Sequence, residues 1–285
     1  MVQQTELYVW DVGDGAAIYV KTPNDKHVVI DCGASDDFSP ADYIKSTLGV
    51  STINGLVISH PHKDHINDIL KIKEHWDKVN EIKLLMRNKE IGKELLIESN
   101  NDLKDDKYVK GYYELADSFN GGNPSKEYLD FGGLERKYFL NTNTDEKPDS
   151  STINNLSVVT FIKFGADVVL YGGDMEEYGW KEILGKDGFK ELLKKTTIYI
   201  ASHHGHKSGY YADIFEYFQP KLTIIPGNKR DDDDDATGEY DEKTEGMSID
   251  GKDEKVLTTY EDGHIHITLY DDGEPKVKLN DPPKT

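Results

Sequence analysis

The chain has 285 residues, with 34 Lys and Arg against 54 Asp and Glu, and therefore a formal net charge of −20. Hydrophobic residues make up 36% of it, and 17 Tyr and 9 Phe supply enough large apolar surface for a core, which excludes wholesale disorder. No apolar run approaches the roughly 18 to 20 residues of a membrane span. A single cysteine, Cys32, excludes an internal disulfide, and no secretory signal is visible, so a cytoplasmic protein is expected.

The acidic charge balance restricts the partners of this chain. A basic groove that grips many phosphates by releasing their counterions is excluded, so binding of long duplex DNA in that way is not expected. Two bound dications would carry their own positive charge, and a site of that kind is compatible with a short phosphate-containing substrate. No membrane association is expected.

Short apolar runs bounded by turn residues predict strands, and in the first third of the chain they cover residues 6–12, 16–21, 27–31, 55–59 and 83–86. Ser39 and Pro40 are typical of a helix start, as N-cap and first helical residue. Helical spacing of isoleucines and leucines follows from Ile66 to Ile72.

The texture changes over residues 88–150, which are rich in Lys, Asp, Glu, Asn and Tyr. This segment predicts a helical insertion, with helices near 90–98 and 107–118 and a Gly-rich turn at 121–122. Strands are then predicted at 156–163, 166–171, 197–201, 221–226, 255–260 and 264–270, and helices at 176–195 and 210–218. The alternation of strands and helices in each half favours one layered α/β domain over residues 1–285.

An acidic loop is expected over about residues 229–252, which contain the run Asp231–Asp235. Five adjacent carboxylates repel one another, so a solvated, mobile loop is the first interpretation. Calcium binding or contact with a basic protein partner are the alternatives.

The strongest chemical signal is the motif His60-x-His62-x-Asp64-His65, which directly follows a predicted buried strand. Ten histidines in 285 residues make three at this spacing improbable by chance. His60 and His62 can point to one side of an extended segment, while Asp64 and His65 sit where the chain turns into a helix. The spacing therefore predicts one metal ion at His60 and His62 and a second at Asp64 and His65. Imidazole and carboxylate ligands suit Zn²⁺, and also Mn²⁺ or Fe²⁺.

Two later strand ends supply further candidate ligands. Asp174, in Gly-Gly-Asp, can bridge two metal ions with its two carboxylate oxygens, and a helix N-cap is the structural alternative. His203 and His204 follow another buried strand, and at least one of them is expected to be a ligand. The other would orient a ligand or meet the substrate.

In combination, these features resemble the metallo-β-lactamase superfamily, and more narrowly the hydrolase domain of ComEC-type DNA-uptake (competence) proteins and their stand-alone relatives. The resemblance is carried by Trp10–Ala17, Val29–Gly33, His60–His65, Asn154–Ser157, Gly172–Asp174, Ser202–Gly205 and Thr258–Gly263. It implies a four-layer αββα sandwich with its metal site at one edge of two sheets, decorated here by the helical insertion.

The resemblance also implies roles around the ligands. Asp31 is implied to steady the metal loop rather than to bind metal. Many relatives have a further His ligand where this chain has Asn155 and Ser157, which are therefore expected to support the ligands. The first metal ion would then be held by His60, His62 and Asp174 alone.

Near the last motif, His204 matches the superfamily's Gly-His-Gly turn better than His203 does, so His204 is the favoured ligand. His206 stands where a Ser often follows in relatives. His206, Lys207 and Ser208 are candidates to contact a substrate phosphate, and a solvated turn is the alternative.

The sequence thus predicts a hydrolase that uses metal-activated water, with Asp64, Asp174 and His204 as catalytic residues and two divalent ions, Zn²⁺ or Mn²⁺. Asp64 is expected to hold the second ion and to receive a proton. A phosphodiesterase or nuclease acting on nucleic acid or a nucleotide is favoured, because the resemblance points to nuclease-type hydrolysis. The alternatives are a β-lactamase-like hydrolase of another ester, amide or lactone, and a non-catalytic partner in a defence or toxin-type assembly that binds protein through the insertion or acidic loop.

Overall fold

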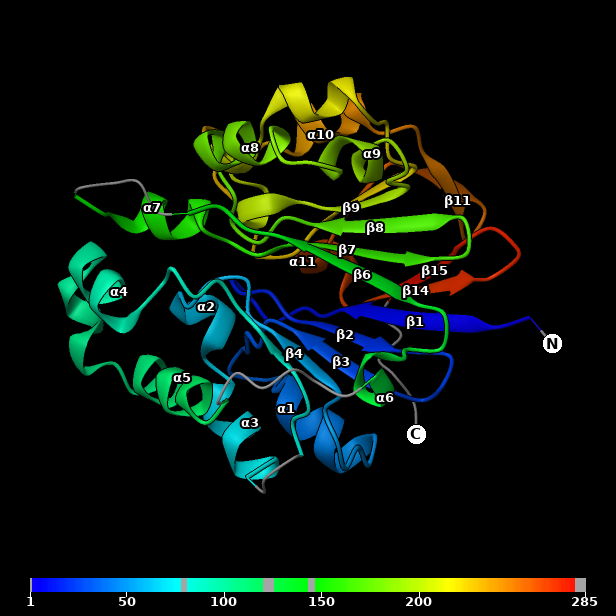
Figure 1. Ribbon diagram of the computed structural model, residues 1–285. Helices are drawn as coiled ribbons and strands as arrows, with labels where there is room; N and C mark the ends of the chain where they lie inside the picture. The colour runs from blue at the N-terminus through cyan, green and yellow to red at the C-terminus, as the bar shows by residue number, and fades with distance from the viewer. Residues whose placement is uncertain (1, 78–80, 120–125, 143–146, 280–285) are drawn as a thin grey trace.

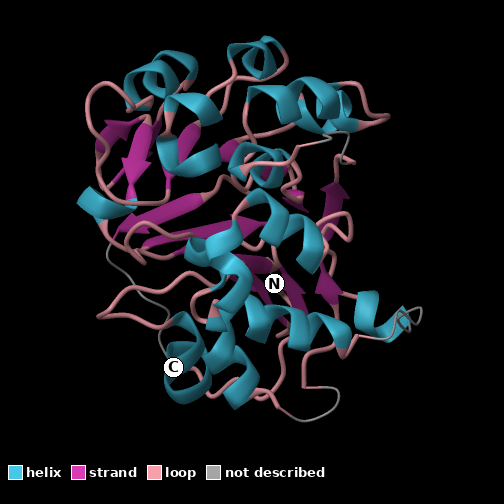
Figure 2. Ribbon diagram, turned by 90° about the vertical axis from the view of Figure 1, so that its left-hand side faces the viewer, coloured by secondary structure: helices cyan, strands magenta, loops and turns pink. Residues whose placement is uncertain are grey.

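The computed structural model describes residues 2–77, 81–119, 126–142 and 147–279. Two β-sheets lie face to face, and helices cover the outer side of each, which gives four layers (Figure 1). Figure 2 shows the same layers from the side, with the strands between two sets of helices. The αββα sandwich expected from the sequence resemblance is therefore confirmed.

The first sheet joins both ends of the chain, because β14 pairs with β1 in antiparallel register. Its seven strands follow the order β15-β14-β1-β2-β3-β4-β5. Strands β3, β4 and β5 are parallel to one another. The bounds are β1 Gln4–Val9, β2 Ile18–Lys21, β3 His27–Ile30, β4 Gly55–Val57, β5 Leu85–Met86, β14 Ile265–Tyr270 and β15 Lys276–Leu279.

The second sheet has six strands in the order β13-β10-β9-β8-β7-β6. Strands β8, β9, β10 and β13 are parallel, whereas β6, β7 and β8 form an antiparallel meander. The bounds are β6 Glu135–Phe139, β7 Val159–Phe164, β8 Asp167–Tyr171, β9 Ile198–Ile200, β10 Leu222–Ile225 and β13 Val256–Thr258, beside a separate hairpin of β11 Met247–Ile249 and β12 Lys252–Glu254.

Helices near the first sheet are α1 Pro40–Asp42, a π-helical turn at Tyr43–Thr47, α2 Lys63–Ile66, α3 Ile69–His75, α4 Lys93–Ser99, α5 Lys107–Asp117 and α6 Lys126–Leu129. Helices near the second sheet or between strands are α7 Ser150–Asn155, α8 Glu177–Leu184, α9 Phe189–Leu193, α10 Thr237–Lys243 and α11 Thr259–Asp262. The N-cap expected at Ser39 is confirmed, because its side chain accepts a hydrogen bond from the Asp42 amide. None of the helices in the described ranges combines the length and apolarity needed to cross a bilayer.

Apolar side chains form three clusters, one between the sheets and one under each helical layer. Strand β1 shows how the sequence specifies them. Leu7 and Val9 belong to the cluster between the sheets, whereas Tyr8 and Trp10 belong to the cluster under the first helical layer. Since successive side chains of a strand point to opposite faces, both faces of β1 are buried.

The expected insertion at 88–150 is helical only in part. Helices α4 and α5 lie close to the predicted positions, but β6 pairs with β7 at the edge of the second sheet, so the purely helical interpretation is wrong. Four of the five β6 residues are polar or aromatic with a hydroxyl, and an edge strand of this kind lacks the apolar alternation used to recognise strands. The predicted Gly-rich turn at 121–122 lies outside the described residues.

Two predicted helices differ in the structure. The helix expected at 176–195 is divided into α8 and α9, and Gly188, with a φ of +78°, stands at the break. The helix expected at 210–218 is a short 3₁₀ turn at Ala212–Glu216. Phe215 and Phe218, three residues apart, both pack edge-on against Tyr199, with ring centroids 5.9 and 6.0 Å away.

The prediction of a loop over 229–252 is wrong beyond residue 236, because this segment contains α10, β11 and the first residue of β12. The acidic run itself is a turn that is hydrogen-bonded to a neighbouring loop. The Lys207 amide donates to the Asp234 carbonyl at 3.0 Å, and the Ala236 amide donates to the Gly205 carbonyl at 2.9 Å. The Asp235 side chain accepts a hydrogen bond from the amide of Thr237, the first residue of α10, at 2.8 Å. The run is therefore anchored on both sides rather than a free loop.

Candidate metal centre

The candidate ligands come from three strand ends at one edge of the sandwich. Residues His60–His65 follow β4 in the first sheet, Asp174 follows β8, and His203 and His204 follow β9 in the second sheet. Strands β8 and β9 are parallel neighbours, so their carboxyl ends lie together. The fold thus brings together residues more than 100 positions apart in the chain.

Asp64, His65, Asp174 and His204 form a cluster whose candidate ligand atoms all lie within 4.8 Å of one another. His65 Nε2 is 3.1 Å from both Asp174 Oδ1 and His204 Nε2. His204 Nε2 is 3.2 Å from Asp64 Oδ2. The Asp64 side chain is 37% exposed and the other three are buried, so the cluster opens to solvent at Asp64.

His60 and His62 form a second group on the other side of Asp174. His60 Nε2 is 3.0 Å from His62 Nδ1 and 3.6 Å from Asp174 Oδ2. The two oxygens of Asp174 therefore face different histidines, Oδ2 toward His60 and Oδ1 toward His65 and His204. This arrangement has the form of two adjacent sites that share one carboxylate.

The hydrogen bonds of this cluster leave several lone pairs directed at one another, and a cation would satisfy them. His65 Nδ1 lies 2.8 Å from the Asp31 carboxylate and His204 Nδ1 lies 3.1 Å from the Pro226 carbonyl. Both partners are acceptors, so both Nδ1 atoms carry hydrogen, and in a neutral imidazole the Nε2 atom then presents a lone pair. Two such atoms face each other next to Asp174 Oδ1, which is buried with no hydrogen-bond partner. A divalent metal ion fits this donor set.

The electrostatics agree with a cation at this position. Burial alone lowers the pKa of a histidine, yet Asp174 and Asp64 raise the pKa of His204 to about 9. The same carboxylates and Asp31 raise the pKa of His65 well above its usual range, against its burial. Burial and His65 hold the pKa of His60 well below its usual range, so His60 keeps a free lone pair. The cluster retains positive charge, as protons or as metal.

Asp31 is the centre of the hydrogen-bond network behind the cluster. Its Oδ1 accepts from the Ser59 amide at 2.7 Å, and its Oδ2 accepts from Ser59 Oγ at 2.7 Å, Tyr171 Oη at 2.6 Å and His65 Nδ1 at 2.8 Å. Asp31 is buried and touches the rear nitrogen of His65, which agrees with a supporting role.

Substitution Asp31→Asn is expected to lower metal affinity roughly 10- to 100-fold, the usual cost of losing an outer partner of a ligand. All four groups that contact the carboxylate can donate, so an amide nitrogen in place of either oxygen would face a donor. Titration of the metal-free protein with Zn²⁺ measures the effect. Asp68→Asn is the matched control, because Asp68 is also buried but accepts from Ser39 and Ala41 instead. Equal Zn²⁺ affinity in the two variants would contradict the role of Asp31.

His203 and His204 are adjacent but point into different surroundings. Both have left-handed backbone conformations, with φ of +52° and +54°, which are uncommon for residues other than glycine and cluster at functional sites. His203 Nδ1 lies 2.9 Å from Ser208 Oγ and 3.4 Å from Glu176 Oε1. Of the pair, His204 is the one whose side chain lies in the cluster.

Ser157 and Asn155 occupy different surroundings. Ser157 Oγ accepts from the Asp174 amide at 3.1 Å and lies 3.4 Å from His60 Nδ1, so it contacts both groups of ligands. The Asn155 side chain accepts from the Glu176 and Gly179 amides at the start of α8. Asn155 thus fixes the helix that follows Asp174, and its hydrogen bonds do not reach a histidine of the cluster.

The three candidate substrate residues, His206, Lys207 and Ser208, belong to a loop that contacts the acidic run Asp231–Asp235. His206 forms an ion pair with Asp234, and Lys207 Nζ donates to the Asp233 carbonyl at 3.0 Å. Ser208 contacts His203. In this state the three polar groups are engaged by the protein, two of them by the acidic run.

Gly15 and Gly33 permit close backbone contact with the loop His60–His65. A Cβ atom on Gly15 would lie 2.3 Å from the Asp64 carbonyl oxygen, and one on Gly33 would lie 2.5 Å from it. The Cys32 amide also donates to the His65 carbonyl at 2.8 Å. Backbone from β1–β2 and β3 therefore braces the loop, which only residues without a side chain allow.

Several residues of the site were missed by sequence reasoning. Ser59 and Tyr171 bind Asp31, the Pro226 carbonyl orients His204, and Glu176 lies beside His203. Ser59 and Glu176 could have been suspected, because each lies within two residues of a candidate ligand. Tyr171 and Pro226 carry no such signal.

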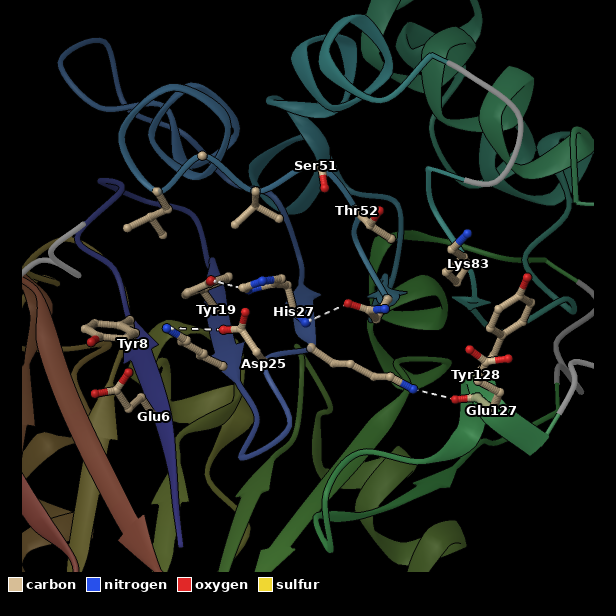
Figure 3. Close-up of a pocket in the computed structure, with 16 residues that line it drawn as sticks. Glu6, Tyr8, Tyr19, Asp25, His27, Ser51, Thr52, Lys83, Glu127 and Tyr128 are labelled. Carbon is tan, nitrogen blue, oxygen red and sulfur yellow. Dashed lines mark hydrogen bonds and ion pairs between the residues drawn. The ribbon is translucent and has the colours of Figure 1, made fainter.

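The structure also has a cavity of about 670 Å³ away from this cluster (Figure 3). It lies on the outer face of the first sheet, where Tyr8, Tyr19 and His27 form part of its lining. Glu127 and Tyr128 of α6 contribute another wall, at the opposite end of the sandwich from α2 in Figure 1. None of the lining residues belongs to the cluster, so this cavity is separate from the candidate metal centre.

Comparisons with known proteins agree with the architecture. The sequence pattern of the Metallo-beta-lactamase superfamily matches residues 10–85. ComE operon protein 3 of Bacillus subtilis (strain 168) is 23% identical over 245 residues, which are 79% of this chain and 28% of that protein, so the chain spans about a quarter of that relative's length.

Two solved structures extend the comparison. The metallo-beta-lactamase fold protein YhfI from Bacillus subtilis is 12% identical, with a TM-score of 0.52 over 94% of this chain and 99% of that one. A diphosphatase from the PhnP family is 14% identical, with a TM-score of 0.49 over 95% of this chain and 99% of that one, too distant to bear on activity. The chain has the metallo-β-lactamase fold, and the resemblance expected from its motifs is confirmed.

Proposed function

We propose that this protein of metallo-β-lactamase fold is a metal-dependent hydrolase that cleaves small phosphodiesters. The observation that carries the proposal is the shared carboxylate of Asp174, whose two oxygens face histidines from opposite groups at 3.1 to 3.6 Å. Two divalent ions, Zn²⁺ or Mn²⁺, would supply there an activated water and polarisation of the scissile oxygen.

The residues of the chain have distinct tasks in this proposal. His60, His62 and Asp174 Oδ2 would hold one ion, and Asp64, His65, His204 and Asp174 Oδ1 would hold the other. Asp31 and Pro226 keep the hydrogens of His65 and His204 on Nδ1, so the two Nε2 lone pairs would be available to bind a cation. Asp64 is the member of the cluster that reaches solvent, so its carboxylate is placed to pass a proton outward.

The charge of the metal site and the net charge of the chain limit the class of substrate. A phosphodiester is favoured by the resemblance of the motifs to ComEC-type DNA-uptake hydrolase domains and by the cationic character of a dinuclear site. Long nucleic acid is disfavoured, because the chain has a net charge of −20 and the acidic run is anchored beside the His204 loop. Dinucleotides, cyclic dinucleotides or strand ends meet both conditions.

The test is a substrate panel with protein loaded with Zn²⁺ or Mn²⁺. We expect hydrolysis of bis(4-nitrophenyl) phosphate and of dinucleotides, at a higher kcat/KM than for duplex DNA of a hundred base pairs or so. Metal content is measured on the same samples, and chelated protein is the control. Turnover of 4-nitrophenyl acetate or a β-lactam without any phosphodiester turnover would replace this proposal by the ester or lactam alternative. Absence of both metal and turnover would favour the non-catalytic alternative.

A further inference from the structure

Arg230 lies beside the candidate metal centre, on the loop that follows β10. Its Nε donates to the His204 carbonyl at 3.5 Å, and its Nη1 is 3.7 Å from Asp14 Oδ1. The arginine side chain is 20% exposed, whereas the Asp14 side chain is 67% exposed. The Arg230 side chain is therefore largely buried, next to the backbone of a candidate ligand.

Asp14 connects Arg230 to the other ligand loop. It belongs to the turn Gly13-Asp14-Gly15, and Gly15 lies against the Asp64 carbonyl. The Ala16 amide, just after this turn, donates to that carbonyl at 3.4 Å. Arg230 thus spans from the loop of His204 to the turn that contacts the Asp64 backbone.

Both contacts of Arg230 are long for a cation held in this position. A charged hydrogen bond between nitrogen and oxygen is usually about 2.7 to 2.9 Å long, and a guanidinium has five N–H donors in a planar fork. The contacts at 3.5 and 3.7 Å engage this fork weakly among the described residues. Planar forks of this kind match the paired oxygens of a phosphate group.

We propose that Arg230 binds the non-bridging oxygens of the substrate's phosphodiester group, which rests on the proposed function. The adjoining residues limit the substrate further. Asp231–Asp235 follow directly and are anchored to the loop of His204 and Lys207. A second phosphate on that side would meet carboxylates, so the site selects a substrate that presents one phosphodiester at a time.

The experiment uses the metal-loaded protein and two readouts, binding of inorganic phosphate by calorimetry and KM for bis(4-nitrophenyl) phosphate. Arg230→Gln is expected to weaken phosphate binding and raise KM by about tenfold or more, as for loss of a charged hydrogen bond. Arg230→Lys should fall between Arg230→Gln and the wild type. Lys229→Gln is the matched control, because Lys229 is exposed and its loss removes the same charge one residue away. We expect it to change both values less than about twofold.

A second variant tests the idea from the other side. Asp14→Asn removes the carboxylate that competes for the guanidinium, so phosphate should bind about twofold tighter or more. If Arg230→Gln loses its metal, the phosphate affinity of Asp14→Asn decides whether Arg230 binds phosphate. Unchanged phosphate affinity in both Arg230→Gln and Asp14→Asn would overturn the assignment. If both affinities are unchanged and the protein still hydrolyses phosphodiesters, only the role of Arg230 is refuted. If phosphate binding depends on Arg230 but no phosphodiester is hydrolysed, only the proposed function is refuted.

Discussion

Asp174→Asn is expected to abolish turnover, by about 10³-fold or more, and to remove bound metal while the fold is kept. Loss of charge stabilisation worth about 4 kcal/mol corresponds to a factor of this size. Asp174 is approached by His60, His65 and His204, and the pKa of its carboxyl is held well below the usual range by the histidines, against its burial. A neutral amide lacks the negative charge and has only one oxygen, so it cannot offer a separate carboxylate oxygen to each group of histidines. Turnover and metal per chain are measured on the same sample.

The matched control is Asp167→Asn, because Asp167 is the first residue of β8, the strand that Asp174 follows. Asp167 is buried and accepts from Thr197, 30 residues along the chain, but lies outside the cluster. Its substitution is expected to leave metal content unchanged. Melting temperatures of both variants in the presence of chelator separate a folding defect from a metal defect. An Asp174→Asn protein that keeps full metal content and wild-type turnover shows that this residue does not bridge.

His204→Ala and His203→Ala are expected to differ by at least about tenfold in activity, although the residues are neighbours. His204→Ala removes a candidate ligand, so metal affinity should fall by about 100-fold or more, beyond the usual cost of losing an outer partner. His203→Ala removes a side chain that contacts Ser208 and Glu176, so metal affinity should fall by about tenfold at most. The readouts are Zn²⁺ titration and kcat/KM.

The two variants control for each other, because both substitutions place an alanine at a left-handed position on the same turn. Any effect of that backbone change on stability is shared and is measured by thermal unfolding without metal. Equal losses of Zn²⁺ affinity in the two variants would contradict the separate surroundings of the two side chains. A larger loss for His203→Ala would assign the ligand to His203.

The candidate ligands could be found in the sequence because their chemistry restricts residue type. Metal ligands are histidine or carboxylate, and His60–His65, Asp174 and His204 each follow an apolar run that predicts a strand. Parallel neighbouring strands place such residues at one edge of a sheet. The choice between His203 and His204 depended on family resemblance alone, since both follow β9 and only the backbone turns them apart.

The supporting residues could not be found in this way. Tyr171 binds Asp31 across 140 residues of sequence, and Arg230 lies on a segment that was expected to be an acidic loop. A tyrosine on a strand or an arginine before a charged run is ordinary in any protein. The positions of Tyr171 and Arg230 depend on how the two sheets pack against each other, and a local sequence pattern carries no information about that packing.

Composition and apolar periodicity determined the α/β class, the absence of a long apolar span and the ligand types, because each depends on residues close in sequence. Only the tertiary structure decided that β6 joins the second sheet, that the acidic run is anchored to the loop of His204, and that Arg230 contacts the His204 carbonyl. Those outcomes depend on long-range packing and charge pairing, whose free energies belong to the whole fold rather than to any segment.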